Sequence, residues 1–175
     1  ARPARPPIPG IDAKGVHHLH APQVVQAFEA GKAVFVEKPL AHTYDEITRM
    51  MAAERKYKVA CQMGNQGHAG EGARLVNEWI GAGSIGDVKE VHCWTNRPIW
   101  PQGKMERSEE IPSLPNYLDW NLWRGPAKID EFHANYVHYD WHWFWKTGNG
   151  DMNNQGTHQL DVARWALDTD QTHPV

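Results

Sequence analysis

Cysteine is scarce in this 175-residue chain, which contains only Cys61 and Cys93. Two cysteines in segments with strand-like sequence do not make the framework of spaced pairs found in small disulfide-rich domains. Long apolar runs are also absent, because no stretch approaches the roughly 18 residues that a membrane-spanning helix needs. We therefore expect neither a disulfide-stabilised scaffold nor a membrane partner.

Positive charge is equally sparse. The chain carries 18 Lys and Arg against 21 Asp and Glu, which gives a formal net charge of −3. A nucleic-acid-binding surface needs Lys and Arg clustered on one face, whereas the one basic stretch is Arg2 and Arg5 among prolines. We expect no nucleic-acid partner. The sequence does not decide between a cytoplasmic and a bacterial periplasmic location.

The first half of the chain alternates between patterns typical of strands and of helices. Apolar runs at 33–36 and 59–63 predict buried strands. A helix follows each strand: one opens at Thr43, which with Glu46 fits a capping box, and the other covers 70–80. This alternation is typical of a parallel sheet with crossover helices, so the sequence predicts an α/β fold.

Three histidines, His17, His18 and His20, precede the first helix. Such a cluster can bind a metal ion, but no spaced Cys or carboxylate ligands accompany it, and we predict no metal site. We interpret the histidines as a loop that leads into a helix, with Pro22 at an early helical position and Gly31 at the end.

Two groups of apolar side chains are candidates for the core. One recurs at helical spacing and is predicted to be buried: Ile47, Met50 and Met51. The other consists of Trp141, Trp143 and Trp145, which alternate with His142 and Phe144 as they would on a strand. Core packing is the default explanation for these indoles, and an aromatic wall for a sugar ring is the alternative.

The character of the chain changes after residue 84. Residues 87–95 have the alternation of a strand, and 96–147 are rich in proline and tryptophan. We therefore predict a domain boundary between 84 and 85.

Polar residues follow both predicted strands of the first half. Lys38 and Pro39 end the first strand, and Pro39 keeps the preceding Lys38 extended. Asn65 and Gln66 lie in the glycine-bearing loop after the second strand. Open α/β sheets bind ligands at the carboxyl ends of their strands. The alternatives are a solvated strand-end lysine and an ordinary turn.

A second polar group lies about 120 residues further on. If the chain is helical from about Asn154, then Asn154 and His158 share one face, one turn apart. Asp161 follows three residues later, close enough to influence His158. An imidazole beside an amide, facing Lys38, could transfer protons. The alternative is a helix-start histidine with local hydrogen bonds.

Together these segments resemble the Gfo/Idh/MocA oxidoreductases, which include glucose–fructose oxidoreductase and inositol dehydrogenase. The Glu-Lys-Pro and Gly-Thr-His-x-x-Asp motifs at this spacing are fairly specific, and the resemblance covers roughly residues 11–175. The matching segments are His17–Pro22, Glu29–Lys32, Val36–Leu40, Gln62–Gln66, Ile85–Gly86, 120–126 and Gly150–Trp165.

The resemblance implies a partial Rossmann-like doubly wound sheet in residues 1–84, which binds NAD or NADP. It implies part of a second α/β (α+β) domain in 85–175 for substrate binding and oligomerisation, and a homo-oligomer when complete. By the resemblance, Lys38 and His158 are catalytic, with Asn154 beside them. The implied cofactor-binding residues are His20, Glu37, Lys38, Pro39, Asn65 and Gln66.

The chain departs from the family pattern at informative places. The phosphate-binding G-x-G-x-x-G loop is missing before Glu37. Just before the His20 region, Asp12–Val16 replaces the strand ending in Thr-Pro that the family usually has. Asn154 replaces a frequent aspartate, and an amide cannot raise the basicity of His158 as a carboxylate would. We therefore expect a fragment that is inactive on its own.

The expected activity of the complete protein is hydride transfer between a sugar, cyclitol or related polyol and a nicotinamide cofactor. An NAD-dependent glycosidase of the same family is one alternative, and a non-catalytic carbohydrate-binding relative is another.

Overall fold

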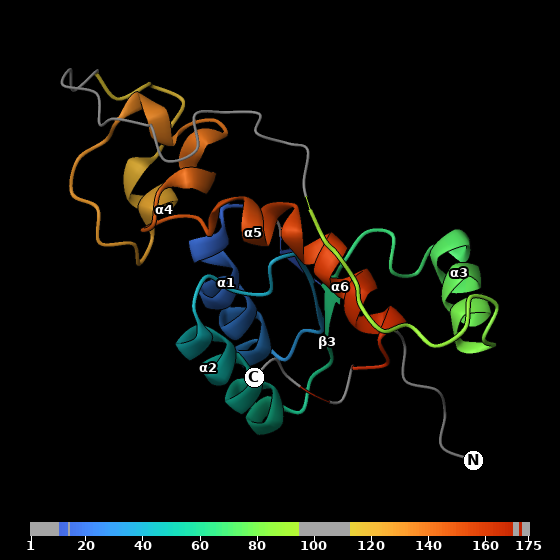
Figure 1. Ribbon diagram of the computed structural model, residues 1–175. Helices are drawn as coiled ribbons and strands as arrows, with labels where there is room; N and C mark the ends of the chain where they lie inside the picture. Colours follow the sequence, from blue (N-terminus) through green and yellow to red (C-terminus); the bar gives the residue numbers. More distant parts are fainter. Residues whose placement is uncertain (1–10, 14, 95–112, 170–171, 173–175) are drawn as a thin grey trace, which may run out of the picture.

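A three-stranded parallel sheet organises the first half of the molecule (Figure 1). The computed structural model describes residues 11–13, 15–94, 113–169 and 172. The strands run in the order β1 (Ile11–Ala13), β2 (Val34–Glu37) and β3 (Cys61–Gly64). The crossover helices are α1 (His17–Glu29) and α2 (Tyr44–Tyr57). The predicted parallel α/β arrangement is confirmed.

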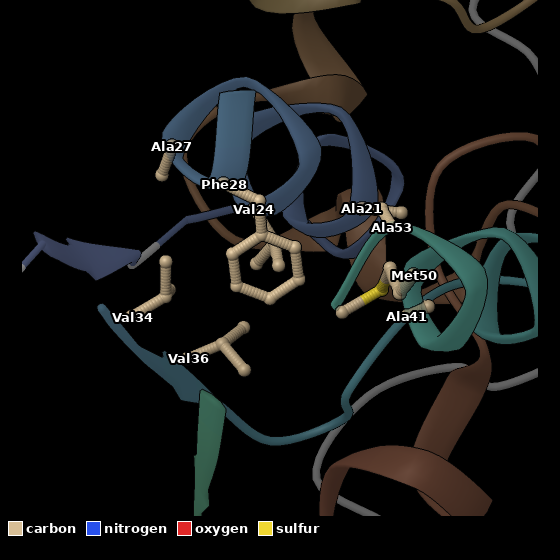
Figure 2. Close-up of a cluster of buried hydrophobic side chains, with 9 residues drawn as sticks. All are labelled: Ala21, Val24, Ala27, Phe28, Val34, Val36, Ala41, Met50 and Ala53. Carbon is tan, nitrogen blue, oxygen red and sulfur yellow. The ribbon is translucent and has the colours of Figure 1, made fainter. Parts of the chain in front are cut away.

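Both crossover helices cover the same face of the sheet. Val34 and Val36 point from β2 toward this face and are buried, as the two-residue period of a strand requires. Figure 2 shows the resulting core cluster, in which Phe28 lies between the helices and β2. The intervening Phe35 faces the other side, where 43% of its surface is exposed. In the described residues, the core cluster of the sheet therefore lies on one face only, the face that α1 and α2 cover.

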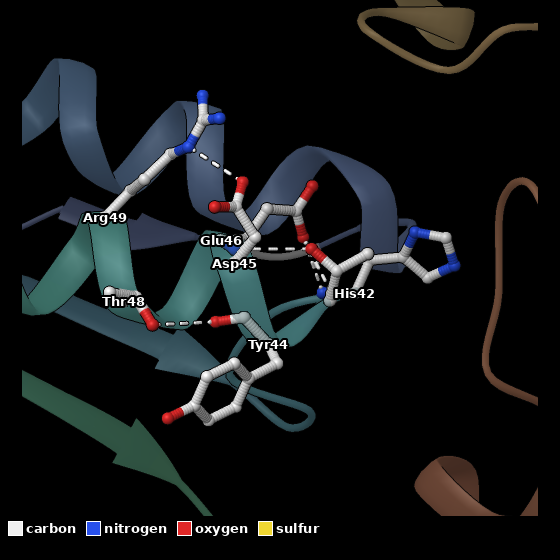
Figure 3. A network of polar contacts seen from close by, with 7 residues as sticks. His42, Tyr44, Asp45, Glu46, Thr48 and Arg49 are labelled. Carbon is white, nitrogen blue, oxygen red and sulfur yellow. Dashed lines mark hydrogen bonds and ion pairs between the residues drawn. The ribbon is translucent and has the colours of Figure 1, made fainter.

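The start of α2 is fixed by a capping box, as predicted (Figure 3). The Thr43 hydroxyl accepts a hydrogen bond from the Glu46 main-chain N–H at 3.2 Å. The Glu46 carboxylate accepts hydrogen bonds from the main-chain N–H groups of Thr43 and His42, at 3.0 and 2.9 Å. These contacts satisfy N–H groups that a helix start otherwise leaves without partners.

The start of α1 was predicted too late. His17–His20 form its first turn rather than a loop, and Pro22 lies inside the helix. The reason is tertiary, because the buried His18 ring faces two distant main-chain carbonyls, those of Trp123 at 3.0 Å and Thr147 at 3.3 Å. A sequence pattern contains no sign of such contacts.

The helix α3 (Glu71–Gly81) agrees with the prediction for 70–80, but the strand predicted for 87–95 is wrong over 87–94. In the structure this segment crosses α6 (Gly156–Ala166) in a non-regular conformation (Figure 1). The Cys93 thiol contacts the Gln159 carbonyl at 3.6 Å. A strand needs a neighbouring strand, and the segment packs on a helix instead. Residue 95 is outside the described part.

The helices of the remaining described chain are short. They are α4 (Trp120–Arg124), η1 (Ala134–Tyr136), η2 (Asp140–Trp143) and α5 (Gly150–Asn154), followed by α6. No helix among the described residues has both the length and the apolar character needed to cross a bilayer.

The predicted strand of alternating tryptophans is wrong. Trp141 and Trp143 belong to the 3₁₀ helix η2, where Trp141 is buried, whereas Trp145 follows it and is 91% exposed. A 3₁₀ helix has three residues per turn, so side chains two positions apart point in different directions. The indoles therefore do not form a common wall for a sugar ring.

Candidate active site

The side chain of Lys38 meets Asn154 across a sequence separation of 116 residues. Lys38 follows β2, where its main-chain N–H donates to the Gly64 carbonyl on β3 at 3.2 Å. Its Nζ donates to Oδ1 of Asn154 at 2.9 Å and also to the Asn154 carbonyl oxygen. The end of the sheet and the end of α5 thus form one polar site.

Tyr139 is a member of this site that the sequence reasoning missed. Nδ2 of Asn154 donates to the Tyr139 hydroxyl at 3.1 Å. Because Oδ1 accepts from Lys38 and Nδ2 donates to Tyr139, the orientation of the amide is defined. The Tyr139 hydroxyl retains its own proton, which it can donate to a further acceptor. No motif marks Tyr139, which lies before η2 in an irregular segment.

His158 lies near the start of α6, and the single helix predicted from about Asn154 is broken at Gln155. Burial lowers the pKa of His158 below its ordinary value, and the positive charge of Lys38 lowers it further. A main-chain contact with Gln66 and the charge of Asp161 act in the opposite direction. A neutral imidazole near an ammonium group can accept a proton.

Asp161 influences His158, as predicted, but its direct partner is another histidine. Nδ1 of His68 lies 2.6 Å from Oδ2 of Asp161. The His68 ring also stacks on Trp165, with centroids 4.6 Å apart. These contacts join the loop after β3 to α6.

The predicted cofactor residues of that loop border a cavity of about 610 Å³ at the ends of β2 and β3. Asn65 and Gln66 line it together with Glu37, Phe35 and other residues. Oδ1 of Asn65 is buried without a hydrogen-bond donor. A cavity with such an atom suits a ligand that supplies an N–H or O–H group.

His20 lies elsewhere, beneath the Lys38–Pro39 turn. It is buried, with Nδ1 at 2.7 Å from the Pro39 carbonyl oxygen and Nε2 at 3.2 Å from that of Gly15. Both ring nitrogens therefore face the main chain in this structure. The arrangement holds the turn that presents Lys38, and the predicted contact of His20 with a cofactor stays a prediction.

A buried pair of histidines, His17 and His142, lies behind Lys38. Their ring centroids are 5.3 Å apart. Burial lowers the pKa of His17 to about 3, and the neighbouring His142, His20 and Lys38 contribute in the same direction, against a contact with Asn149 that raises it. Among the described residues, no group of three or more His, Cys, Asp and Glu side chains could hold a metal ion.

One segment has the letters of the phosphate-binding motif, Gly81-Ala-Gly-Ser-Ile-Gly86. It follows helix α3 and leads into the irregular segment up to residue 94. Gly83 and Gly86 have φ values of 78° and 74°, as in turns that end a helix. The fingerprint requires a preceding strand and a following helix whose N-terminus faces the phosphate. This segment is therefore a helix ending rather than a phosphate loop.

Comparison with known families gives two matches. Residues 6–65 match the NAD-binding Rossmann fold of the Gfo/Idh/MocA oxidoreductase family, and residues 85–175 match the C-terminal alpha/beta domain of that family. The domain boundary between 84 and 85 stays a prediction.

Individual relatives are similar over part of their length. The chain is 39% identical over 84 residues to inositol 2-dehydrogenase 3 of Saccharopolyspora erythraea, a match that covers 47% of this chain and 25% of that protein. It is 32% identical over 122 residues to an inositol 2-dehydrogenase of Gluconacetobacter diazotrophicus, covering 69% and 36%. The matched regions thus span about a quarter to a third of these relatives.

A solved structure shares the fold over most of the chain. An NAD-binding protein from Listeria innocua has a TM-score of 0.56 at 18% identity, covering 91% of this chain and 35% of that one. At this identity the likeness supports the fold alone, and it confirms the predicted partial Rossmann sheet followed by part of an α/β domain. Since the C-terminal family match alone covers more than half of the chain, the chain belongs to the Gfo/Idh/MocA oxidoreductase family.

Proposed function

We propose that the complete protein is an NAD(P)-dependent oxidoreductase that oxidises a hydroxyl group of a sugar, cyclitol or related polyol. The observation that carries the proposal is the contact of Lys38 with Asn154, beside a histidine whose pKa is lowered. The inositol dehydrogenases among the relatives favour a cyclitol.

The described residues fit one end of a nicotinamide cofactor. Glu37, Asn65 and Gln66 would hold it at the cavity beyond β2 and β3, where the buried Asn65 Oδ1 can accept a hydrogen bond from an amide. When bound there, the nicotinamide would supply the hydride acceptor for the oxidation of a substrate carbon. The sequence before Glu37 supplies no glycine-rich loop for the pyrophosphate.

The chain's own residues would handle the substrate oxygen and its proton. The Lys38 ammonium can donate to the substrate hydroxyl oxygen and stabilise the negative charge that develops there. Neutral His158 accepts the hydroxyl proton as the carbon loses hydride, so that a ketone forms. Asn154 orients Lys38, and the Tyr139 hydroxyl is placed to donate to a second oxygen of the substrate.

The test uses the complete protein, a panel of inositols and monosaccharides, and NAD or NADP, with net formation of reduced cofactor as the readout. We expect Lys38→Ala and His158→Ala each to lower turnover by about 10²- to 10⁴-fold. Lys89→Ala is the control, because this side chain is exposed and pairs locally with Asp87.

Two results would count against this function. Near-native turnover of His158→Ala would remove its proton-transfer role. A free sugar released from a glycoside without net reduced cofactor would indicate the glycosidase alternative, and sugar binding without any turnover would indicate a binding protein. The predicted homo-oligomer stays a prediction that size-exclusion chromatography with light scattering can test.

A further inference from the structure

His68 is held against α6 by two different contacts. Its Nδ1–H donates to Oδ2 of Asp161 at 2.6 Å, the short distance typical of a charge-assisted hydrogen bond. Its ring lies nearly parallel to the Trp165 indole, with an angle of 14° between the planes and 4.6 Å between centroids. Asp161 and Trp165 are four residues apart on α6 and therefore lie on one face.

The contact of His68 with Asp161 and Trp165 joins the loop after β3 to α6. Both of these segments lie next to His158, the proposed catalytic histidine. On the helix, His158 precedes Asp161 by three residues, which places it on the adjoining turn. On the loop, Gln66 precedes His68 by two residues, and the Gln66 main chain contacts the His158 ring. A shift of His68 away from α6 would therefore displace a direct contact of His158.

An ordinary surface ion pair is the simplest alternative, and the chain contains one for comparison. His92 and Glu90 lie 3.0 Å apart, with 71% and 74% of their side chains exposed, and they are two residues apart in the sequence. Exposed ion pairs of this kind contribute little to the free energy of unfolding. The His68 and Asp161 side chains are 47% and 30% exposed, and they connect segments 93 residues apart.

We propose that His68 is a positioning residue for His158, because it fixes α6 to the loop after β3 through Asp161 and Trp165. This role rests on the proposed oxidoreductase function. The charged groups that face His158 are Lys38, from the end of β2, and Asp161, from its own helix. His68 thus acts on the reaction through the position of the imidazole. His68 and Asp161 also border the cavity beyond β2 and β3.

The kinetic test replaces His68 with phenylalanine, which keeps a ring to stack on Trp165 and removes the N–H. We expect His68→Phe to lower kcat by about 10- to 100-fold, since small displacements of a catalytic group have effects of this size. We measure kcat at saturating cofactor, because His68 borders the cavity proposed for the nicotinamide. His68→Asn keeps an N–H donor for Asp161 and should recover part of the activity. Tyr44→Phe, at an exposed position of α2, is the control and should leave kcat unchanged.

A double-mutant cycle separates positioning from a general structural effect. In a His158→Ala background, His68→Phe should lower the residual kcat by less than about twofold, because the group that it positions is gone. An equal loss in both backgrounds would overturn the proposal, and so would an unchanged kcat in His68→Phe.

Imidazole NMR keeps the proposal testable if the complete protein lacks dehydrogenase activity. His68→Phe should then change the ring resonances of His158, whereas Tyr44→Phe, at an exposed position of α2, should not. Asp161→Asn should lower the pKa of His158, because the charge of Asp161 raises it. Unchanged His158 resonances in His68→Phe would reject the positioning role, whatever the reaction of the enzyme.

Discussion

Nζ of Lys38 lies 2.9 Å from Oδ1 of Asn154, so that an ammonium at the end of β2 is paired with a neutral amide at the end of α5. A carboxylate in the place of this amide would neutralise Lys38 and raise the proton affinity of His158. The amide does neither. At this contact the charge of Lys38 is not neutralised, and His158 keeps a lowered pKa.

Asn154→Asp should therefore shift the pH dependence of turnover while leaving activity measurable in the complete protein. The added carboxylate faces Lys38, whose positive charge lowers the pKa of His158, so it favours the imidazolium and raises that pKa. The limb that reports this group should move to higher pH in a profile of kcat against pH. Asn153→Asp adds the same charge one position earlier and should shift the limb less. A profile identical to wild type would contradict the electrostatic account.

Local signals in the sequence identified much of the first half. The apolar runs before Lys38 and Asn65 marked both strands, and the spacing of Thr43 and Glu46 marked the start of α2. These signals work because each depends on residues a few positions apart. The approach of Lys38 to Asn154 followed from the family resemblance, together with the rule that ligands bind at the ends of parallel strands.

Features that depend on distant contacts could not be predicted. Residues 87–94 alternate like a strand, but the structure places them on α6. The alternating tryptophans lie in and after η2, because Trp141 packs in the interior while Trp145 faces solvent. Tyr139 enters the site only through the position of Asn154. In each case the deciding partner is far away in the sequence.

Met50 and Met51 offer a direct test of the one-sided core. Both were predicted to be buried, and for Met51 the prediction is wrong: Met50 is 3% exposed and Met51 is 47% exposed. Adjacent helix positions differ by about 100° in direction, so only one of the two can face the sheet. Met50→Ala should lower the free energy of unfolding by about 2–5 kcal/mol. Met51→Ala should change it by less than about 0.5 kcal/mol in urea titrations, and equal losses would contradict this packing.

Two threonines, Thr43 at the N-cap of α2 and Thr48 inside the helix, should respond differently to replacement by alanine. Thr43→Ala removes the hydroxyl that accepts from Glu46, and we expect a loss of about 1 kcal/mol in unfolding free energy. Thr48 is exposed within the helix, where its hydroxyl donates to the Tyr44 carbonyl. Such back-bonding stabilises helices little, and alanine has the higher helix propensity. Thr48→Ala should therefore leave the melting temperature unchanged or raise it slightly.

His17 should make the stability of the fold sensitive to acid. Its pKa is about 3 in the folded chain against an ordinary value of 6.5, chiefly because the ring is buried. Between these values the unfolded chain binds a proton that the folded chain does not. With respect to His17, the free energy of unfolding is therefore at its maximum above about pH 6.5 and falls as the pH decreases toward 3. One such group changes the free energy of unfolding by up to about 1.4 kcal/mol per pH unit within this window.

His18 and His142 also have lowered pKa values and add to the same slope. His17→Asn removes one titrating group, so its unfolding free energy should depend less steeply on pH, although its absolute stability also falls. His92→Asn, at an exposed position, should keep the wild-type slope. The comparison of slopes, measured by urea unfolding at several pH values between 4 and 7, isolates titration from packing. An unchanged slope in His17→Asn would show that the ring is not buried in its neutral form, and the proposed histidine pair behind Lys38 would then be wrong.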